Sequence, residues 1–325
     1  MDNLTHSLVG ALLGQAGLKK KTGLAMPALI IGANLPDVDA ACFFWLEGTE
    51  HLGFRRGITH GPPALVLLPL ILAGLLWGWD RWQMKRGKRP EGRLPVNFKW
   101  LCLLSLLGCL THPALDWLNV YGIRLLEPFS SQWFYGDTLF IIDIWLWALM
   151  GFATWFSLRR EKKGGDWIKP ARIAIAVSLA YIGLNGYWSM SMRVALEDTL
   201  PLLECSEEAD KCHFTIIASP VPFVPWQREI LFDNPPAWSL VEAGQSIEDG
   251  KIVPISRSLC RMPELEEMRA SNSQLDAFLF WSRAPFATEA EDGSVVLYDA
   301  RFYDPNARDR FSVALPDIKC EPVNL

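Results

Sequence analysis

Three of the five histidines in the sequence directly follow a threonine. The three pairs are Thr5-His6, Thr59-His60 and Thr111-His112. Imidazole is a common transition-metal ligand, and it also exchanges protons near neutral pH. Each pair is predicted to lie at the end of an apolar segment, so the pattern indicates one site for metal or proton chemistry. The other two histidines, His51 and His213, are expected to be ordinary surface or packing residues.

Aspartates accompany these histidines. His112 and Asp116 are four residues apart, so they share one face of a predicted helix. Asp37 and Asp39 belong to the sequence N-L-P-D-V-D, near the end of another apolar segment. Because both follow a proline, helix capping is the alternative role for one of them. We expect at least one of the two to reach the histidines.

Asp137 and Asp143 open a further apolar segment and add carboxylates to the same layer. An aspartate at membrane depth costs about 2.5–3.5 kcal/mol on insertion scales, and neighbouring carboxylates repel each other. A bound divalent cation removes both problems. A mixed set of imidazoles and carboxylates suits Zn²⁺ first, with Mn²⁺ and Fe²⁺ as alternatives. Such an ion activates water and polarises a phosphoryl or acyl group, which predicts hydrolytic chemistry.

The expected roles divide these residues into three groups. The predicted metal ligands are His6, Asp37, His60, His112 and Asp116. The predicted catalytic residues, as general base or as ligands of a second ion, are Asp39 and Asp137, because the donors exceed one tetrahedral zinc sphere. The residues expected to support ligands or substrate are Asp143, Thr5, Thr59, Thr111, Arg55 and Arg56. The two arginines are candidates for binding a lipid or substrate phosphate, and a solvated outer loop is their alternative.

Long apolar runs before residue 192 predict the elements that position this site. A membrane helix needs about 20 mostly apolar residues. The five candidates are Leu24–Leu46, Pro62–Trp79, Lys99–Asn119, Leu139–Leu158 and Ala171–Met192. Leu4–Leu18 is shorter, so we expect a short helix buried among the others, with a signal peptide as the alternative. Residues 1–192 are therefore predicted to form a mainly α-helical, polytopic membrane bundle of about five spans that holds the metal site.

Positive charge concentrates in alternate loops. Lys19–Lys21 follow the first helix, and two further basic loops follow Trp79 and Leu158. Such loops stay on the cytoplasmic side. The alternation predicts that the N-terminus, all three Thr-His pairs and everything after residue 192 face outward.

Residues 193–325 are expected to form a small, soluble α+β domain. They carry 12 basic and 23 acidic residues, whereas residues 1–192 carry 19 and 13. The acidic balance argues against nucleic acid as a partner and leaves a protein partner open. The predicted strands are His213–Ala218, Arg228–Phe232, Ser294–Tyr303 and Arg310–Leu315, and the predicted helix is Pro263–Phe280.

Four of the seven cysteines lie in this soluble part. A domain on the outer side lies in an oxidising compartment, where cysteines can pair. Cys205 with Cys212 is the nearest pairing and leaves Cys260 with Cys320, although the sequence keeps other pairings open.

The membrane part resembles a known bacterial family. The matching pieces are D-N-L-T-H at 2–6, N-L-P-D-V-D at 34–39, R-R-G-I-T-H-G at 55–61, T-H-P-A-L-D at 111–116 and F-Y-G-D-T-L-F-I-I-D at 134–143. As a set they resemble the LexA-regulated, inner-membrane-associated, metal-dependent hydrolases described as YdjM-like. The resemblance implies a multi-spanning bacterial inner-membrane protein, and a looser kinship with zinc phospholipase C and nuclease-like enzymes implies a phosphoester substrate. Gly61 stands where many relatives have Ser, which leaves His60 itself unaffected.

These observations predict a membrane-bound metal-dependent hydrolase. The site opens at headgroup level on the outer face of the inner membrane, so the predicted substrate is a lipid or a lipid-linked ester or phosphoester. A metal-ion or proton transporter is the first alternative, because buried His and Asp also line ion pathways. The inner halves of the spans, such as Leu65–Trp79, are almost wholly apolar, which favours the enzyme. A membrane scaffold with a structural metal is the second alternative.

Overall fold

The chain folds into two units of different character. The structure is a computed structural model that describes residues 1–199, 216–221, 223–234, 237–242, 253–254, 256, 258–305 and 307–322. The first unit consists of Met1–Asp39 and Arg56–Gly186, and the second consists of Ala40–Arg55 and Tyr187–Leu325. The second unit thus takes in residues 40–55, which lie between two apolar helices in the sequence.

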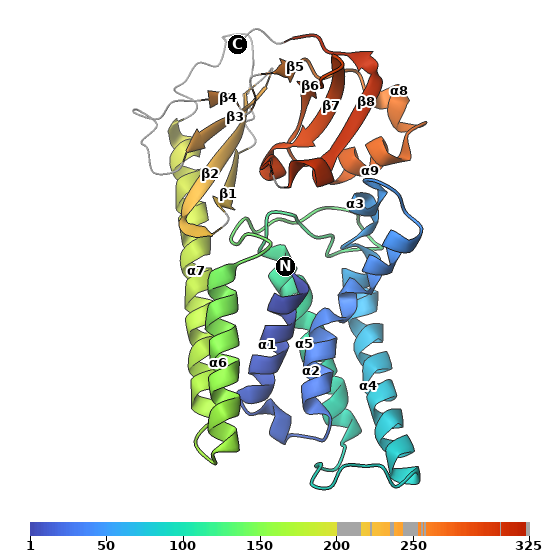
Figure 1. The fold of residues 1–325 in the computed structure, drawn as a ribbon, viewed down its shortest axis with the longest axis vertical. Helices are drawn as coiled ribbons and strands as arrows, with labels where there is room; N and C mark the ends of the chain where they lie inside the picture. Colours follow the sequence, from blue (N-terminus) through green and yellow to red (C-terminus); the bar gives the residue numbers. More distant parts are fainter. Residues whose placement is uncertain are drawn as a thin grey trace. The chain divides into compact units, whose positions relative to one another are not determined.

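The first unit is built from α-helices (Figure 1). They are α1 Asn3–Gln15, α2 Ala25–Asn34, α4 Pro62–Lys85, α5 Phe98–Trp117, α6 Ile144–Lys162 and the larger part of α7 Ile168–Thr199, with the 3₁₀-helices η1 Leu18–Lys20, η2 Leu35–Phe44 and η3 Ile58–His60 between them. In the part of the chain that is described, four segments are long and apolar enough to cross a membrane. These are Ala25–Phe44, Pro62–Lys85, Phe98–Trp117 and Ile168–Ala195. The predicted mainly helical membrane bundle is therefore confirmed.

The predicted span Leu139–Leu158 is only partly correct. Its helix, α6, begins at Ile144, because the carboxylate of Asp143 caps it. This carboxylate accepts hydrogen bonds from the backbone N–H groups of Trp145 and Leu146 at 3.0 and 2.9 Å. The last turn of α6 is basic, which further shortens its apolar stretch. The described residues accordingly contain four candidate spans, where the sequence predicts about five.

The chain changes conformation at the end of α2. The sequence predicts one continuous span over Leu24–Leu46, but α2 ends at Asn34 and the chain continues as η2. Pro36 explains the change, because proline lacks a backbone N–H and its ring clashes with the preceding turn of an α-helix. A 3₁₀-helix has three residues per turn, so Asp37 and Asp39 point in different directions. The two carboxylates are thus available to different partners.

Two glycines let the backbones of α2 and α5 come into contact. A Cβ atom at Gly108 would lie 2.7 Å from the carbonyl oxygen of Leu29, and one at Gly32 would lie 2.9 Å from the carbonyl oxygen of Ser105. Any side chain at either position would therefore push the helices apart. Small residues permit such close helix packing in membranes. The contact holds the backbone of α2 against the part of α5 that leads to His112.

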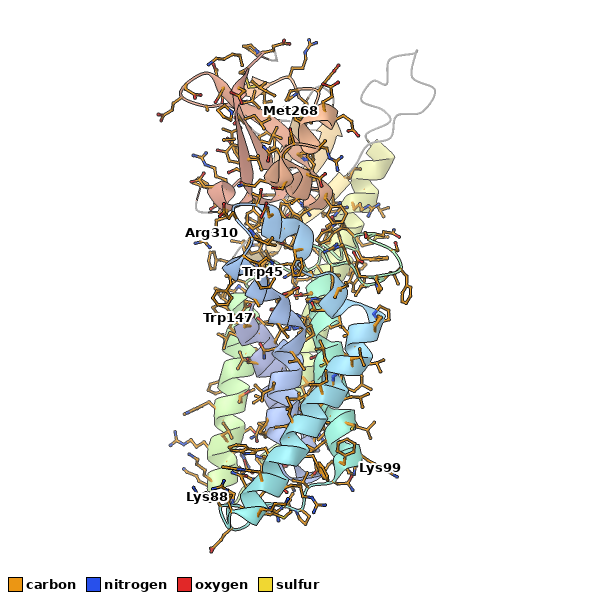
Figure 2. The ribbon with its side chains drawn as sticks, turned by 90° about the vertical axis from the view of Figure 1, so that its right-hand side faces the viewer. Trp45, Lys88, Lys99, Trp147, Met268 and Arg310 are labelled. Atoms are coloured by element: carbon orange, nitrogen blue, oxygen red, sulfur yellow. A yellow bond between two sulfur atoms is a disulfide. The ribbon has the colours of Figure 1, made fainter. Side chains whose placement is uncertain are left out.

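The basic loops lie at one end of the first unit. The connections between α1 and α2, between α4 and α5 and between α6 and α7 are all at the lower end of the helices in Figure 1. Lys88 and Lys99 are labelled at this end in Figure 2, and Trp147 lies toward the other end. The Thr59-His60 and Thr111-His112 pairs lie toward that other end too, because the first precedes α4 and the second is near the end of α5.

The described residues of the second unit form two antiparallel sheets of four strands each (Figure 1). The strand orders are β1 Ile216–Val221, β2 Val224–Asn234, β3 Ala237–Glu242 and β4 Val253–Pro254 in one sheet, and β5 Leu259–Cys260, β6 Pro285–Glu289, β7 Ser294–Asp299 and β8 Ser312–Lys319 in the other. Ile217 and Leu231 of the first sheet share a buried core with Phe286 of the second. The short helix α3 Glu50–Phe54 belongs to this unit, and the preceding Thr49 donates a hydrogen bond to the carbonyl of Gln274 at 2.8 Å.

The predicted strands are found where the structure describes them. His213–Ala218 overlaps β1, Arg228–Phe232 lies within β2, Ser294–Tyr303 contains β7 and Arg310–Leu315 overlaps β8. The single helix predicted over Pro263–Phe280 is wrong, because the segment forms α8 Glu266–Arg269 and α9 Ser273–Trp281. Asn272 begins the second of these helices by accepting a hydrogen bond from the N–H of Leu275 at 3.0 Å, a role that asparagine favours.

Cys260 and Cys320 form a disulfide, as one of the predicted pairings requires. It joins β5 to the residue that follows β8, so it closes the second sheet. Cys205, Cys212 and His213 lie outside the described residues.

Asp299, the last residue of β7, is fully buried together with Arg301. Its carboxylate accepts hydrogen bonds from the hydroxyl of Ser282 and from Nε and Nη2 of Arg301, the last two at 2.8 Å. Burial by itself would raise the pKa of Asp299. The charge of Arg301 and these hydrogen bonds outweigh burial and hold the pKa below its ordinary value of 3.8.

We expect Asp299→Asn to destabilise the second unit by about 1–3 kcal/mol at neutral pH, because it weakens a buried charged hydrogen-bond network. Since the folded-state pKa lies below the unfolded one, the carboxylate stabilises the fold fully above the unfolded pKa and loses this effect as the pH falls through the folded value. The difference in unfolding temperature between wild type and variant should therefore become smaller as the pH is lowered below the ordinary pKa of aspartate. Asp317→Asn, at an exposed position of β8, is the control. A difference that stays constant with pH would contradict the prediction.

Candidate metal centre

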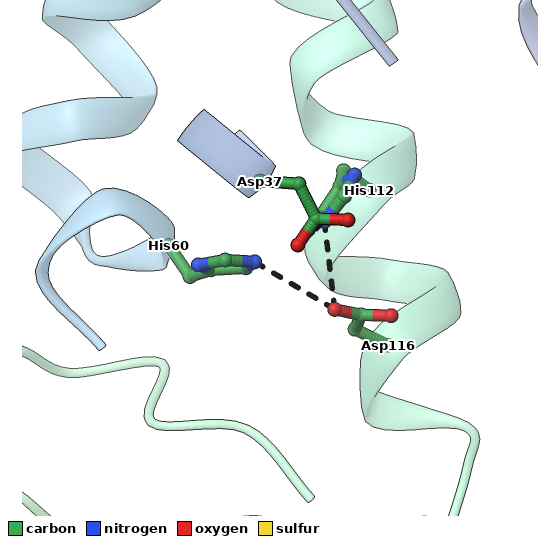
Figure 3. Close-up of side chains that lie close together, drawn as sticks. All are labelled: Asp37, His60, His112 and Asp116. Atoms are coloured by element: carbon green, nitrogen blue, oxygen red, sulfur yellow. Dashed lines mark ion pairs between the residues drawn. The ribbon is translucent and has the colours of Figure 1, made fainter. Parts of the chain in front are cut away.

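Asp37, His60, His112 and Asp116 come together in the first unit (Figure 3). One donor atom from each residue lies within 4.8 Å of the donor atoms of the others. The first comes from η2, the second from η3, and the last two from one face of α5. His60, His112 and Asp116 are completely buried, whereas Asp37 is partly exposed. This group could hold a metal ion, and it comprises four of the five residues that the sequence suggests as ligands.

A backbone carbonyl orients His112. Nδ1 of His112 lies 2.7 Å from the carbonyl oxygen of Ala33, the penultimate residue of α2. A carbonyl oxygen only accepts, so Nδ1 carries the proton and donates it to this bond. Nε2 then presents its lone pair to the cluster, 3.5 Å from Oδ2 of Asp116 and 3.8 Å from Oδ1 of Asp37. The close packing of α2 on α5 thus sets the tautomer of a candidate ligand.

Thr59 and Asp39 orient His60 in a similar way. The hydroxyl of Thr59 donates to Oδ2 of Asp39 at 3.2 Å, and Nδ1 of His60 lies 3.0 Å from the same hydroxyl. Because this hydroxyl has already given its proton, it accepts one from Nδ1. Asp39 also lies 3.6 Å from Nδ1. Nε2 of His60 is left with its lone pair, 3.6 Å from Oδ2 of Asp116. Asp39 therefore lies on the Nδ1 side of the ring, outside the four-residue cluster.

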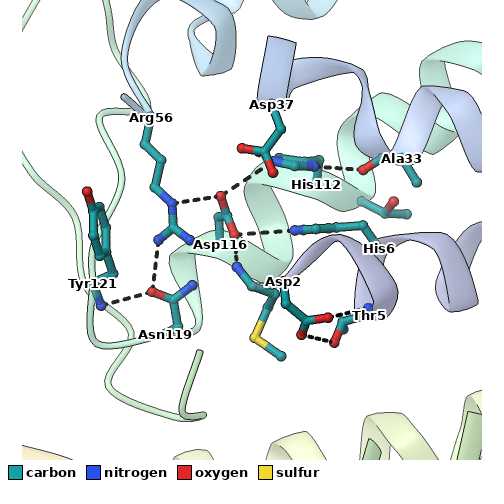
Figure 4. A network of polar contacts seen from close by, with 12 residues as sticks. Asp2, Thr5, His6, Ala33, Asp37, Arg56, His112, Asp116, Asn119 and Tyr121 are labelled. Carbon is teal, nitrogen blue, oxygen red and sulfur yellow. Dashed lines mark hydrogen bonds and ion pairs between the residues drawn. The ribbon is translucent and has the colours of Figure 1, made fainter. Parts of the chain in front are cut away.

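His6 packs against the cluster from α1 (Figure 4). Its ring stacks on that of His112, with the ring centres 3.8 Å apart and the planes inclined by 15°. Its Nε2 lies 3.4 Å from Oδ1 of Asp116, and the side chain is fully buried. Neither ring nitrogen of His6 has a hydrogen-bond partner among the described residues.

Asp116 is the carboxylate on which these contacts converge. Nε of Arg56 lies 3.1 Å from its Oδ2, and the amino group of Met1 contacts its Oδ1. The guanidinium of Arg56 is itself held by Nη1 hydrogen bonds to Oδ1 of Asn119 and to the carbonyl of Gly122, at 3.0 and 3.1 Å. With only 6% of its surface exposed, Arg56 is a buried partner of Asp116 (Figure 4) and is not a solvated loop residue.

The lone pairs of the cluster face a carboxylate. In the portion of the chain that is described, Nε2 of His60 and Nε2 of His112 make no hydrogen bond. Both nitrogens and the oxygens of Asp116 are acceptors, so they repel one another. Burial makes such unsatisfied groups costly. A cation placed among them removes the conflict, and the mixture of imidazole and carboxylate donors fits a divalent transition metal.

Two of the predicted supporting threonines have other partners. Thr5 donates to Oδ2 of Asp2 at 2.6 Å and accepts from Nε1 of Trp147 at 2.9 Å, so it completes the cap of α1. Thr111 donates to the carbonyl of Gly108 at 2.6 Å within α5. Both hydroxyls are therefore engaged in or beside the helices next to the cluster.

Three further predicted residues lie outside the four-residue cluster. Asp143 caps α6 and accepts a hydrogen bond from the hydroxyl of Tyr181 at 2.9 Å. Asp137 has a left-handed backbone, with φ of 45°. Arg55 belongs to the second unit, where its guanidinium carbon lies 5.5 Å from the ring centre of Phe43.

Sequence reasoning missed the residues that hold Arg56. Asn119 accepts from Arg56 and from the backbone N–H of Tyr121, whose ring centre lies 4.3 Å from the guanidinium carbon (Figure 4). Asn119 lies three residues after Asp116, and that spacing is a signal that could have identified it. The carbonyl of Ala33 could not have been found, since a backbone group carries no signal of residue type.

Comparison with known proteins adds three findings. The chain is 25% identical over 320 residues to the uncharacterized protein YfhP of Bacillus subtilis strain 168, a match that covers 95% of this chain and 88% of that protein. No solved structure matches it. The model of the YdjM inner membrane protein family matches residues 1–192, which include every residue of the candidate metal centre. Because this match covers more than half of the sequence, the chain belongs to the YdjM inner membrane protein family.

Proposed function

We propose that the chain is a membrane-embedded, metal-dependent hydrolase that acts on a lipid or a lipid-linked ester or phosphoester. The observation that carries the proposal is the pair of buried Nε2 atoms of His60 and His112 that face Asp116 without a hydrogen bond to any described residue. A divalent cation bound there supplies a Lewis acid that activates water and polarises a phosphoryl or acyl oxygen. Zn²⁺ is the first choice, and Mn²⁺ or Fe²⁺ suits the same donors.

The proposed ligands are the Nε2 atoms of the two histidines together with the carboxylates of Asp37 and Asp116. His6 is proposed as a further ligand, because its buried Nε2 lies 3.4 Å from the second oxygen of Asp116. Asp37 is the partly exposed member of the cluster. Water and substrate are therefore proposed to approach from its side.

The surrounding residues position these ligands. Thr59 and Asp39 hold the proton of His60 on Nδ1, so that Nε2 faces the cluster. Arg56 holds Asp116 and balances part of its charge. Asp39 is occupied by Thr59 and by the backbone N–H of Arg56, which donates to it at 2.8 Å. Asp39 or Asp137 is proposed as the general base or as a ligand of a second ion.

The site is proposed to face the outer side of the inner membrane. The family and the apolar helices make the chain an inner-membrane protein. Loops rich in Lys and Arg stay in the cytoplasm, and the candidate centre lies toward the other helix ends. The disulfide between Cys260 and Cys320 suits an oxidising compartment, which supports an outer location for the second unit. A substrate that reaches these helix ends from the bilayer is lipid-like, and the second unit is open to a protein partner.

The test is metal content measured by elemental analysis of the full-length protein in detergent. Wild type is expected to hold about one or two divalent ions per chain, and the His60→Ala, His112→Ala variant should lose them. His51→Ala is the matched control, because His51 belongs to the second unit and bonds to the carbonyl of Gly48. The same preparations are then assayed for release of headgroups or phosphate from phospholipids and lipid-linked phosphates.

Two outcomes would count against the proposal. Equal metal content in wild type and double variant would mean that the cluster is not the metal site. Metal-loaded protein without turnover on any lipid class would favour a scaffold with a structural ion over a hydrolase.

A further inference from the structure

An apolar cavity of about 360 Å³ lies within the first unit, between α1, α5, α6 and α7. This volume falls in the range of about 300–1,000 Å³ that is typical of small-molecule sites. Its walls include Val9, Leu115, Met150 and Ile175, one from each helix. On α1 it extends from Thr5 to Leu13, a rise of about 12 Å along the helix.

The cavity adjoins the candidate metal centre. Three of its lining residues directly precede proposed metal ligands in the sequence: Thr5 precedes His6, Thr111 precedes His112 and Leu115 precedes Asp116. Consecutive residues of an α-helix are separated by about 100° around the axis. The cavity therefore runs along the flank of α1 and α5 that is next to the face carrying the candidate ligands.

The cavity has lining residues on the outer surface of the helices. Leu179 of α7 lines it with 64% of its surface exposed, and Ala114 of α5 is exposed as well. Both lie in candidate membrane spans. The surroundings of these residues in a membrane are lipid acyl chains, so a chain can enter the cavity sideways from the bilayer.

The accessible wall of the cavity is apolar. Hydrogen-bonding groups placed against such a wall would lose their partners, which is unfavourable. The part of a lipid that fits the cavity is therefore its hydrocarbon chain.

We propose that this cavity binds an acyl chain of the substrate lipid. The assignment rests on the proposed function and places a hydrocarbon chain of the substrate in the cavity, with the headgroup directed toward the four-residue cluster. The wall of the cavity positions the lipid, and the cluster acts on the part of the lipid that lies beyond it.

The test uses the full-length protein in phosphatidylcholine vesicles that contain a trace of phosphatidylglycerol with a diazirine in one acyl chain. After illumination, crosslinked peptides are identified by mass spectrometry. We expect labels on peptides that contain Val9, Leu115 or Met150. Ile175→Trp, which fills the cavity, should lower this labelling several-fold. Val177→Trp is the matched control on the same helix, at a residue outside the lining with 47% of its surface exposed, and should leave the labelling unchanged.

Labels spread evenly over the outer helix faces, or labelling that Ile175→Trp leaves unchanged, would overturn the cavity assignment. Metal content is measured on the same samples, so loss of the proposed metal function is seen separately from loss of lipid binding.

Discussion

Asp116→Ala is expected to abolish metal binding and to lower the free energy of unfolding by about 3–5 kcal/mol. The loss of metal follows because both buried Nε2 atoms, of His60 and His112, face this one carboxylate. The loss of stability has a separate cause. Arg56 is buried with its Nε 3.1 Å from Asp116, and the substitution leaves its charge without a carboxylate partner.

A second variant separates these two effects. In Asp116→Ala, Arg56→Met the buried charge is removed together with its partner, and replacing a buried ion pair with apolar side chains is often neutral. Its thermal unfolding temperature should recover toward that of wild type, while the metal content should stay low. If Asp116→Ala kept its metal, or if the second substitution restored metal binding, Asp116 would not be a ligand.

Gly108→Ala is expected to weaken metal binding by about 10–100-fold although residue 108 contacts no metal ligand atom. The new Cβ would lie 2.7 Å from the carbonyl oxygen of Leu29, so α2 and α5 must move apart, at a cost of about 1–3 kcal/mol. The movement takes the carbonyl of Ala33 away from Nδ1 of His112, which is held there at 2.7 Å. The histidine is then free to change its orientation and tautomer.

Gly151→Ala is the matched control, because a Cβ at Gly151 of α6 meets no atom within 4 Å. Titration of the metal-free proteins with Zn²⁺ gives the two affinities, and thermal unfolding gives the two stabilities. Equal affinities for the two variants would show that the contact between α2 and α5 does not tune the centre.

The sequence predicts the parts of the site that depend on local spacing. His112 and Asp116 lie one helical turn apart, and that spacing alone places them on one face. The apolar runs also predict that Thr59-His60 and Thr111-His112 lie at segment ends. The bounds of these runs agree closely with the four candidate spans among the described residues. The basic loops likewise share one end of the helices.

The remaining features depend on tertiary packing. Asp37 and Asp39 look equivalent in sequence, and only the 3₁₀ geometry of η2 sends one toward His112 and the other toward Nδ1 of His60. In the sequence Arg56 looks like a solvated loop residue, but in the fold its guanidinium contacts Asn119 and the ring of Tyr121. Asp143 has the residue type of a ligand, but it caps α6 instead. Capping and metal binding both use carboxylates at helix ends, so sequence patterns do not distinguish them.

The order of the donors along the chain has a consequence for biogenesis. All four residues of the cluster, and His6 as well, are contributed by the first 116 residues. A chain emerging from the ribosome therefore presents the complete donor set once α5 has been inserted, before α7 and residues 187–325 of the second unit are made. The cavity beside the cluster needs Met150 and Ile175, so it is completed only later. The proposed ligands are thus all present during translation, before the cavity beside them has its complete wall.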